Sequence, residues 1–117
     1  MSSTIDRHQA DSRLSRIVTH NGVVYLAGLT ADDRNATMKA QTEEVLKKID
    51  ELLKLAGTNK SRLLSAMIYV SDIRLKPQID EAWIAWVDSG NVPSRACMEA
   101  RLGTPDTLVE IIVVAAQ

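Results

Sequence analysis

The chain has 117 residues, of which 45% are hydrophobic and 25% are charged. This length and composition are typical of one soluble globular domain, so residues 1–117 are predicted to form a single domain. The formal net charge of -1 and the lack of clustered Lys and Arg argue against nucleic acid and anionic membranes as partners, because both are bound through basic patches.

The first half of the chain predicts a β-hairpin followed by a long helix. Two strand-like runs, SRIVTH and VVYLA, flank Asn21-Gly22, a dipeptide that tolerates the positive φ angles of a tight hairpin turn. Between residues 36 and 56, apolar side chains recur at three- and four-residue spacing, which predicts an amphipathic helix of about five turns. Asn35 is placed to cap its start and Gly57 to end it.

The second half predicts a strand, a second helix and two further strands. LLSAMIYVSD is rich in branched residues, and Pro77 fits the first turn of a helix that carries Trp83 and Trp86 on one side. These tryptophans either anchor the helix on the sheet or stack on a ligand. SRACMEARL and VEIIVVAA are predicted strands around the turn GTPDT. The order β-β-α-β-α-β-β predicts an α+β fold with a mixed sheet and two helices on one face.

The last strand is apolar on both alternations apart from Glu110. Both of its faces should therefore be covered, although two helices on one side of the sheet cover only one face. A second copy of the chain is the simplest cover for the other face, which predicts a closed homo-oligomer.

Glu110 is costly to desolvate among apolar neighbours unless a donor or a cation meets it. A simple hairpin register would set Leu102 opposite Val109 and Arg101 opposite Glu110, as a cross-strand ion pair. The other interpretation makes Glu110 a general base or a water-positioning group in a pocket. The sequence does not choose between these two interpretations.

Arg95 follows Pro93-Ser94 at the start of a predicted strand. Its planar guanidinium could grip a carboxylate with two hydrogen bonds, although an ordinary surface arginine is the alternative. The hairpin register places Arg95 opposite Ala116, several residues from Glu110. A site that uses both would then be completed across a subunit boundary.

Nucleophilic and metal chemistry find little support in the sequence. Cys97 has no neighbouring histidine and suits a small apolar position better than a nucleophile. His20 precedes the hairpin turn, and His8 is predicted to lie in an N-terminal tail. There is no catalytic triad order, phosphate loop or metal-ligand spacing, which disfavours hydrolases of those types. No cofactor and no metal are expected. One cysteine, a polar N-terminus and no apolar run of ~20 residues predict a cytoplasmic protein.

The sequence resembles the YjgF/RidA family, the reactive-intermediate enamine/imine deaminases. The segments that carry the resemblance are VTHNGVVYLAG, QTEEVLKKIDELLKLAG, NKSRLLSAMIYVSD, IDEAWIAWV and VPSRACMEARL followed by VEIIVVAA. They cover nearly the whole chain, from about Arg13 to Ala116. The most specific part is Pro-x-Arg, which is followed fifteen residues later by the strand glutamate.

The resemblance implies a chorismate-mutase-like fold and a homotrimer with a central β-barrel and clefts between subunits. It implies a hydrolase acting on C–N bonds in metabolite damage control, which converts 2-imino and 2-enamino acids to 2-oxo acids and ammonia. Arg95 would clamp the substrate carboxylate, Glu110 would help to hold the attacking water, and Cys97 would line the cleft. A small 2-imino or 2-oxo acid is thus the expected ligand, with no nucleic acid and no membrane partner.

Three other positions of the expected substrate site depart from the best-known family pattern. Leu14 stands where archetypal members have a tyrosine, Ala27-Gly28 where they have Ser-Gly, and Asp80 where they have an asparagine. The chain therefore looks like a compact, non-archetypal subgroup. Because Leu14 and Ala27 each remove a hydroxyl, the alternative is a trimeric protein that binds small carboxylates without turnover. The ribonuclease label often attached to the family is disfavoured by the acidic pI.

Overall fold

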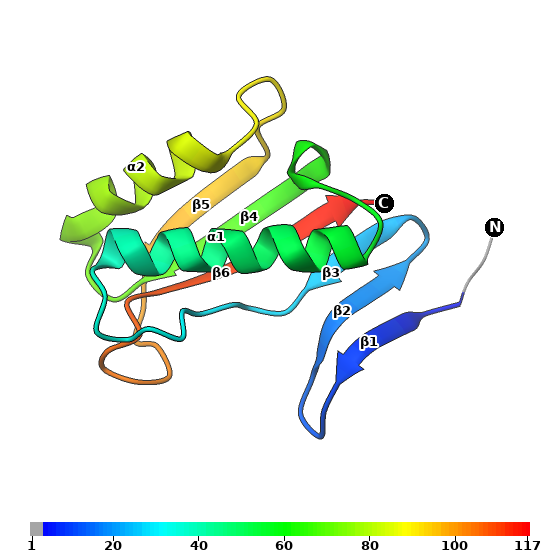
Figure 1. Cartoon of the computed structure of the whole chain (residues 1–117), viewed down its shortest axis with the longest axis horizontal. Coiled ribbons are helices and arrows are strands. Elements are labelled where there is room, and N and C mark those ends of the chain that lie inside the picture. The colour runs from blue at the N-terminus through cyan, green and yellow to red at the C-terminus, as the bar shows by residue number, and fades with distance from the viewer. Residues whose placement is uncertain (1–3) are drawn as a thin grey trace.

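The computed structural model describes residues 4–117 as one mixed sheet with two helices on the same face (Figure 1). Its helices are α1 (Met38–Leu55) and α2 (Lys76–Trp86), with single 3-10 turns η1 (Lys60–Arg62) and η2 (Ile73–Leu75). The strands are β1 (Asp6–Ala10), β2 (Ser15–His20), β3 (Val23–Leu26), β4 (Leu63–Val70), β5 (Ser94–Glu99) and β6 (Val109–Ala116). They lie in the order β1-β2-β3-β6-β4-β5, which confirms the predicted α+β class. Among the described residues, no helix is both long and apolar enough to cross a bilayer.

The N-terminal region contains a predicted hairpin and a strand that was not predicted. Asn21 and Gly22 have φ angles of 50° and 77° between β2 and β3, as the dipeptide indicated. The predicted tail around His8 is wrong, because β1 pairs antiparallel with β2 and adds one strand to the predicted order. All five β1 residues are exposed, so the strand is formed by backbone pairing and leaves no hydrophobic alternation in the sequence.

Helix α1 lies close to the predicted range but has a different cap. Thr37, and not Asn35, is the N-cap, and its side-chain oxygen accepts a hydrogen bond from the Ala40 N–H at 3.1 Å. Gly57 has φ 79° just after the helix, as predicted for a left-handed C-terminal residue. The side of α1 that faces the sheet packs Val45, Ile49 and Leu53 into the core, and each of them is 0% exposed.

Strand β5 is the largest departure from the sequence prediction. It does not form a hairpin with β6, because it pairs in parallel with β4 after the crossover through α2, and it ends at Glu99. Strand β6 instead inserts between β3 and β4 and pairs antiparallel with both. The predicted pairs Leu102–Val109, Arg101–Glu110 and Arg95–Ala116 are therefore wrong. In the structure, Glu110 lies opposite Tyr69, and Arg95 lies opposite Ala66.

The two faces of the sheet differ in cover, although the open face also carries apolar side chains. Along β6, residues on the helix face are buried, whereas the alternate residues on the open face are half-buried. Across β2, β3, β4, β6 and β5, the open face presents Val18, Tyr25, Met67, Ile112, Val114 and Met98. Tyr25 is 47% exposed and Met98 39%. No helix of residues 4–117 covers this open face (Figure 1).

Candidate active site

Arg95 lies on the edge strand β5 and turns toward α2. Its Nη2 donates a hydrogen bond to Oδ1 of Asp80 at 2.8 Å. Its guanidinium carbon lies 5.6 Å from the centroid of the Trp83 ring, within the range of a cation–π contact. The side chain is 23% exposed. Arg95 is thus held at a defined place, while its side chain keeps some exposure to solvent.

Asp80 joins Arg95 to a second cation. Lys76, one helical turn earlier on α2, donates to the other carboxylate oxygen of Asp80 at 2.7 Å. Burial alone would raise the pKa of Asp80, but the hydrogen bonds from Lys76 and Arg95 outweigh it and hold that pKa below its usual range. The carboxylate is therefore charged at neutral pH, and the three side chains together carry one net positive charge.

Cys97 lies two residues after Arg95 and on the same face of β5. It pairs with Ile68 and packs against the hydrophobic core. Burial raises the pKa of the Cys97 thiol, and the positive charges of Arg95 and Lys76 offset only part of that rise. The thiol is therefore protonated at neutral pH, which suits a neutral wall of a site better than a nucleophile.

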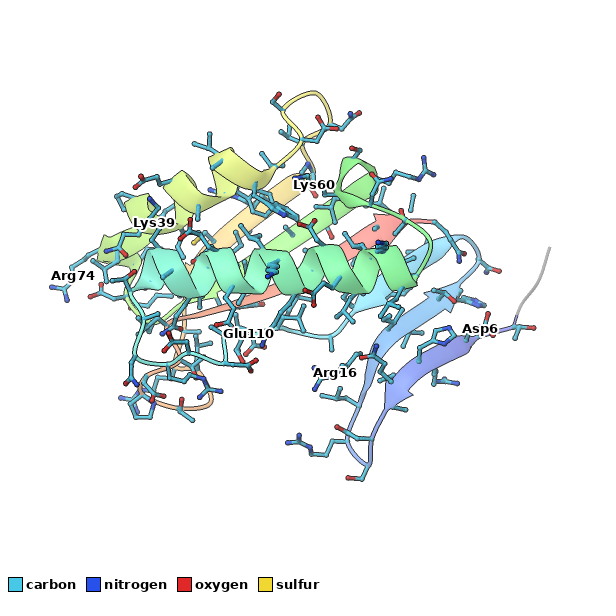
Figure 2. The ribbon with its side chains drawn as sticks, in the orientation of Figure 1. Asp6, Arg16, Lys39, Lys60, Arg74 and Glu110 are labelled. Atoms are coloured by element: carbon cyan, nitrogen blue, oxygen red, sulfur yellow. The ribbon has the colours of Figure 1, made fainter. Side chains whose placement is uncertain are left out.

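Glu110, labelled in Figure 2, lies at the start of β6. The alternation of burial along β6 places it on the open face of the sheet. It is half-buried, and its carboxylate has no hydrogen bond or ion pair with any residue in the range 4–117. Arg95 faces α2 on the other side of the sheet, with β4 between β5 and β6. Within one chain, the structure does not bring Arg95 and Glu110 together.

Gly28 provides the space that the Glu110 side chain occupies. A Cβ atom at Gly28 would lie 3.1 Å from Cδ and 3.3 Å from Cγ of Glu110, and closer still to Oε2. Contacts this short force the carboxylate to move. The glycine at this position is therefore explained by its close approach to Glu110.

We expect Gly28→Ala to displace the Glu110 carboxylate while leaving the fold intact, because the side chain that must move is flexible. If Glu110 positions the attacking water of the imine hydrolysis that the resemblance implies, kcat for that reaction should fall about tenfold or more. The free energy of unfolding should change by less than about 1 kcal/mol. Steady-state kinetics and urea unfolding measure the two effects. Gly103→Ala is the control, because nothing lies within 4 Å of the added carbon. An unchanged kcat in Gly28→Ala would contradict this role of Glu110.

Gln41 on α1 holds the loop that leads into β6. Its side chain is fully buried. Its Nε2 donates to the carbonyl oxygen of Asp106 at 3.0 Å, and its Oε1 accepts from the Leu108 N–H at 3.0 Å. These bonds give the buried Gln41 amide partners for both its oxygen and its nitrogen. Gln41 thereby fixes the chain just before Glu110.

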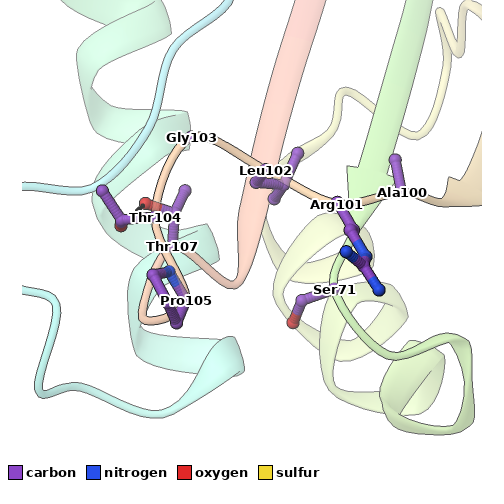
Figure 3. Close-up of a pocket in the computed structure, with 8 residues that line it drawn as sticks. All are labelled: Ser71, Ala100, Arg101, Leu102, Gly103, Thr104, Pro105 and Thr107. Carbon is purple, nitrogen blue, oxygen red and sulfur yellow. Dashed lines mark hydrogen bonds between the residues drawn. The ribbon is translucent and has the colours of Figure 1, made fainter.

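The remaining predicted residues lie apart from Arg95. Leu14 precedes β2 and is 42% exposed, and Ala27 follows β3, where its N–H donates to the Arg16 carbonyl oxygen. Arg101 lies beyond the end of β5 and lines a pocket of about 360 Å³ with Ser71 and the loop that leads to β6 (Figure 3). That pocket includes none of the predicted site residues.

Sequence reasoning missed two residues that lie next to predicted ones. Lys76 contacts Asp80, and the only sequence signal is the i, i+4 spacing of opposite charges on a predicted helix. Tyr69 lies opposite Glu110, which only the pairing of β4 with β6 reveals. Trp83 is 6% exposed and anchors α2 as predicted, yet it also supports the Arg95 guanidinium.

Comparisons with known proteins agree with this fold. The family model described as Endoribonuclease L-PSP matches residues 4–117. A RutC family protein of Haemophilus influenzae is 42% identical over 115 residues, which cover 96% of this chain and 97% of the relative. The RutC family protein YoaB of Escherichia coli K12 is 38% identical over 113 residues, covering 97% of this chain and 98% of that protein.

A solved structure agrees with the sequence matches. The crystal structure of a YjgF family member from Neisseria meningitidis has a TM-score of 0.94 with 35% identity, and the match covers 98% of this chain and 96% of that one. Because both sequence and fold match over nearly the whole chain, the relationship is closer than a shared architecture alone. The chain therefore belongs to the YjgF/RidA family, as the resemblance of its sequence indicated.

Proposed function

We propose that this protein is a cytoplasmic enzyme that hydrolyses reactive 2-imino and 2-enamino acids to 2-oxo acids and ammonia, without a cofactor. Family membership supports the proposal, and one observation on this chain's own residues supports it further. Arg95 is half-buried and firmly held, yet among residues 4–117 only one nitrogen of its guanidinium has a hydrogen-bond partner, which is Asp80. A guanidinium has five N–H donors, so enough remain to bind a substrate carboxylate.

The reaction requires positioning more than a strong nucleophile. A protonated imine carbon is electrophilic, so one water adds to it, the carbinolamine loses ammonia, and the C=N bond becomes C=O. Arg95 holds the carboxylate, and Glu110 accepts a proton from the water as it attacks. Fixing the reactants and placing charge in this way accelerates such a step without covalent catalysis. The neutral Cys97 thiol and Gly28 line the same cleft, together with Leu14 and Ala27.

The proposed cleft lies between subunits of a homotrimer. Arg95 and Glu110 lie on opposite faces of one sheet, so one chain cannot present both to the same substrate. The open face is apolar at Met67, Ile112 and Val114, and such a face is stabilised by burial against other copies. Three sheets closing into a central barrel would cover it and bring Glu110 of one chain toward Arg95 of the next.

The proposal is tested by generating 2-iminobutyrate or 2-iminopropionate in situ with a dehydratase or an amino-acid oxidase. We expect the purified protein to accelerate release of the 2-oxo acid in proportion to its concentration, compared with buffer. Semicarbazide trapping of the remaining imine should fall in parallel. Equal rates with protein and with buffer would exclude the deaminase activity for these substrates.

A second candidate is a trimeric protein that binds small carboxylates without turnover. It is favoured by Leu14 and Ala27, because neither supplies a hydroxyl to hold water or substrate. Calorimetric titration with 2-oxobutyrate separates the two functions. Binding of this 2-oxo acid together with absence of imine turnover would support the second candidate.

A further inference from the structure

Among residues 4–117, Asp80 is the one acidic group in direct contact with Arg95, and it creates a difficulty for a site that binds a carboxylate. An unpaired carboxylate beside Arg95 would repel an anionic ligand and would neutralise the arginine. The structure resolves this with Lys76. Each Asp80 oxygen takes one cation, Oδ1 from Arg95 at 2.8 Å and Oδ2 from Lys76 at 2.7 Å.

The same contacts restrict the guanidinium from two directions. The hydrogen bond to Asp80 holds the guanidinium at its Nη2 atom. The Trp83 ring restricts it from a second side, with the guanidinium carbon 5.6 Å from the ring centroid. Arginine otherwise has many accessible rotamers, and a group that is already ordered loses less entropy when a ligand binds. The arrangement therefore suits a ligand that needs the guanidinium at a fixed angle.

Resting on the deaminase function proposed above, we propose that Asp80 is a positioning residue that orients Arg95, and that Lys76 supplies the compensating charge that keeps this subsite cationic. Asp80 then acts through Arg95 and does not itself bind the substrate carboxylate. The cluster carries one net positive charge, which matches one carboxylate. The subsite therefore selects ligands with a single carboxylate at the position of Arg95.

The experiment separates charge from orientation by holding one constant while the other changes. Lys76→Met lowers the net charge of the cluster to zero. Lys76→Met combined with Asp80→Asn restores it to one positive charge and keeps an oxygen that accepts from Arg95. Lys76→Met combined with Asp80→Ala has the same charge but no acceptor. Glu81→Gln, next to Asp80 but paired with the exposed Lys39, is the control.

Two readouts are compared, the Kd for 2-oxobutyrate by calorimetry and kcat/KM with imine generated in situ. We expect Lys76→Met to raise the Kd about tenfold through the lost charge. The Asn double variant should return within about twofold of wild type, whereas the Ala double variant should stay about tenfold weaker with a lower kcat, because Arg95 is no longer oriented. Glu81→Gln should match wild type.

Each possible result has a defined meaning. Equal values for the Asn and Ala double variants would overturn the positioning role of Asp80, and a wild-type Kd in Lys76→Met would overturn the charge role of Lys76. If the wild type binds 2-oxobutyrate without turnover and the variants follow the expected order, the inference holds although the deaminase activity fails. If the wild type does not bind 2-oxobutyrate at millimolar concentration, the inference is wrong.

Discussion

Replacing Arg95 with alanine is expected to lower kcat/KM for 2-imino acids at least about 100-fold, without unfolding the protein. Truncating one partner of a buried, hydrogen-bonded charge pair typically costs about 2–5 kcal/mol, and each 1.36 kcal/mol is a factor of ten in rate. The substitution would remove the proposed substrate clamp, and it would also leave Asp80 with Lys76 alone among residues 4–117. Steady-state kinetics with imine generated in situ measures the effect, and circular dichroism verifies the fold.

Two further variants make this result specific. Arg95→Lys keeps the positive charge but loses the planar fork, so we expect an intermediate loss. Arg101→Ala is the matched control, because Arg101 is exposed beyond the end of β5 and away from Asp80. If Arg101→Ala reduces activity as much as Arg95→Ala, the assignment of the clamp to Arg95 is wrong.

Replacing Ile112 with aspartate is expected to break the assembly and to abolish activity with it. Ile112 lies on the open face of the central strand β6, opposite Met67 of β4. In a closed barrel, each copy would bury an unpaired carboxylate, which costs several kcal/mol per site. Light scattering at micromolar concentration should give about three times 12.9 kDa for the wild type and 12.9 kDa for the variant.

Ile84→Asp is the matched control for the same change of residue. Ile84 is 72% exposed on α2, a helix that lies on the other side of the sheet. We expect this variant to keep the mass and the activity of the wild type. An Ile112→Asp protein with the wild-type mass would refute burial of the open face between copies, and a monomeric wild type would refute the trimer itself.

The elements that depend on local chemistry were predictable from the sequence. Asn21-Gly22 sets a hairpin turn wherever it lies between two apolar strands, and the spacing from Val45 to Leu53 defines one face of α1. The apolar alternations of β6 similarly indicated that both faces of that strand need cover. Strand β1 escaped prediction because exposed residues paired through their backbone carry no pattern.

The arrangement of the strands was not predictable in the same way. The loop between β5 and β6 contains a turn sequence that suggested a hairpin. The loop is also long enough for the chain to pass β4, so that β6 pairs with β4 and not with β5. Strand β6 has apolar residues on both faces and takes the centre of the sheet, where burial is greatest, whereas β5 takes the edge beside its crossover helix.

The sequence by itself determined the family, the types of element, and the identity of Arg95 and Glu110 as unusual residues in their strands. Only the tertiary structure decided that these two lie on opposite faces of the sheet, that Gly28 makes room for Glu110, and that Asp80 joins Arg95 to Lys76. The physical reason is that periodicity and turn chemistry act over a few residues. Contacts between side chains from different elements depend on strand order, which is set by the burial of the whole sheet.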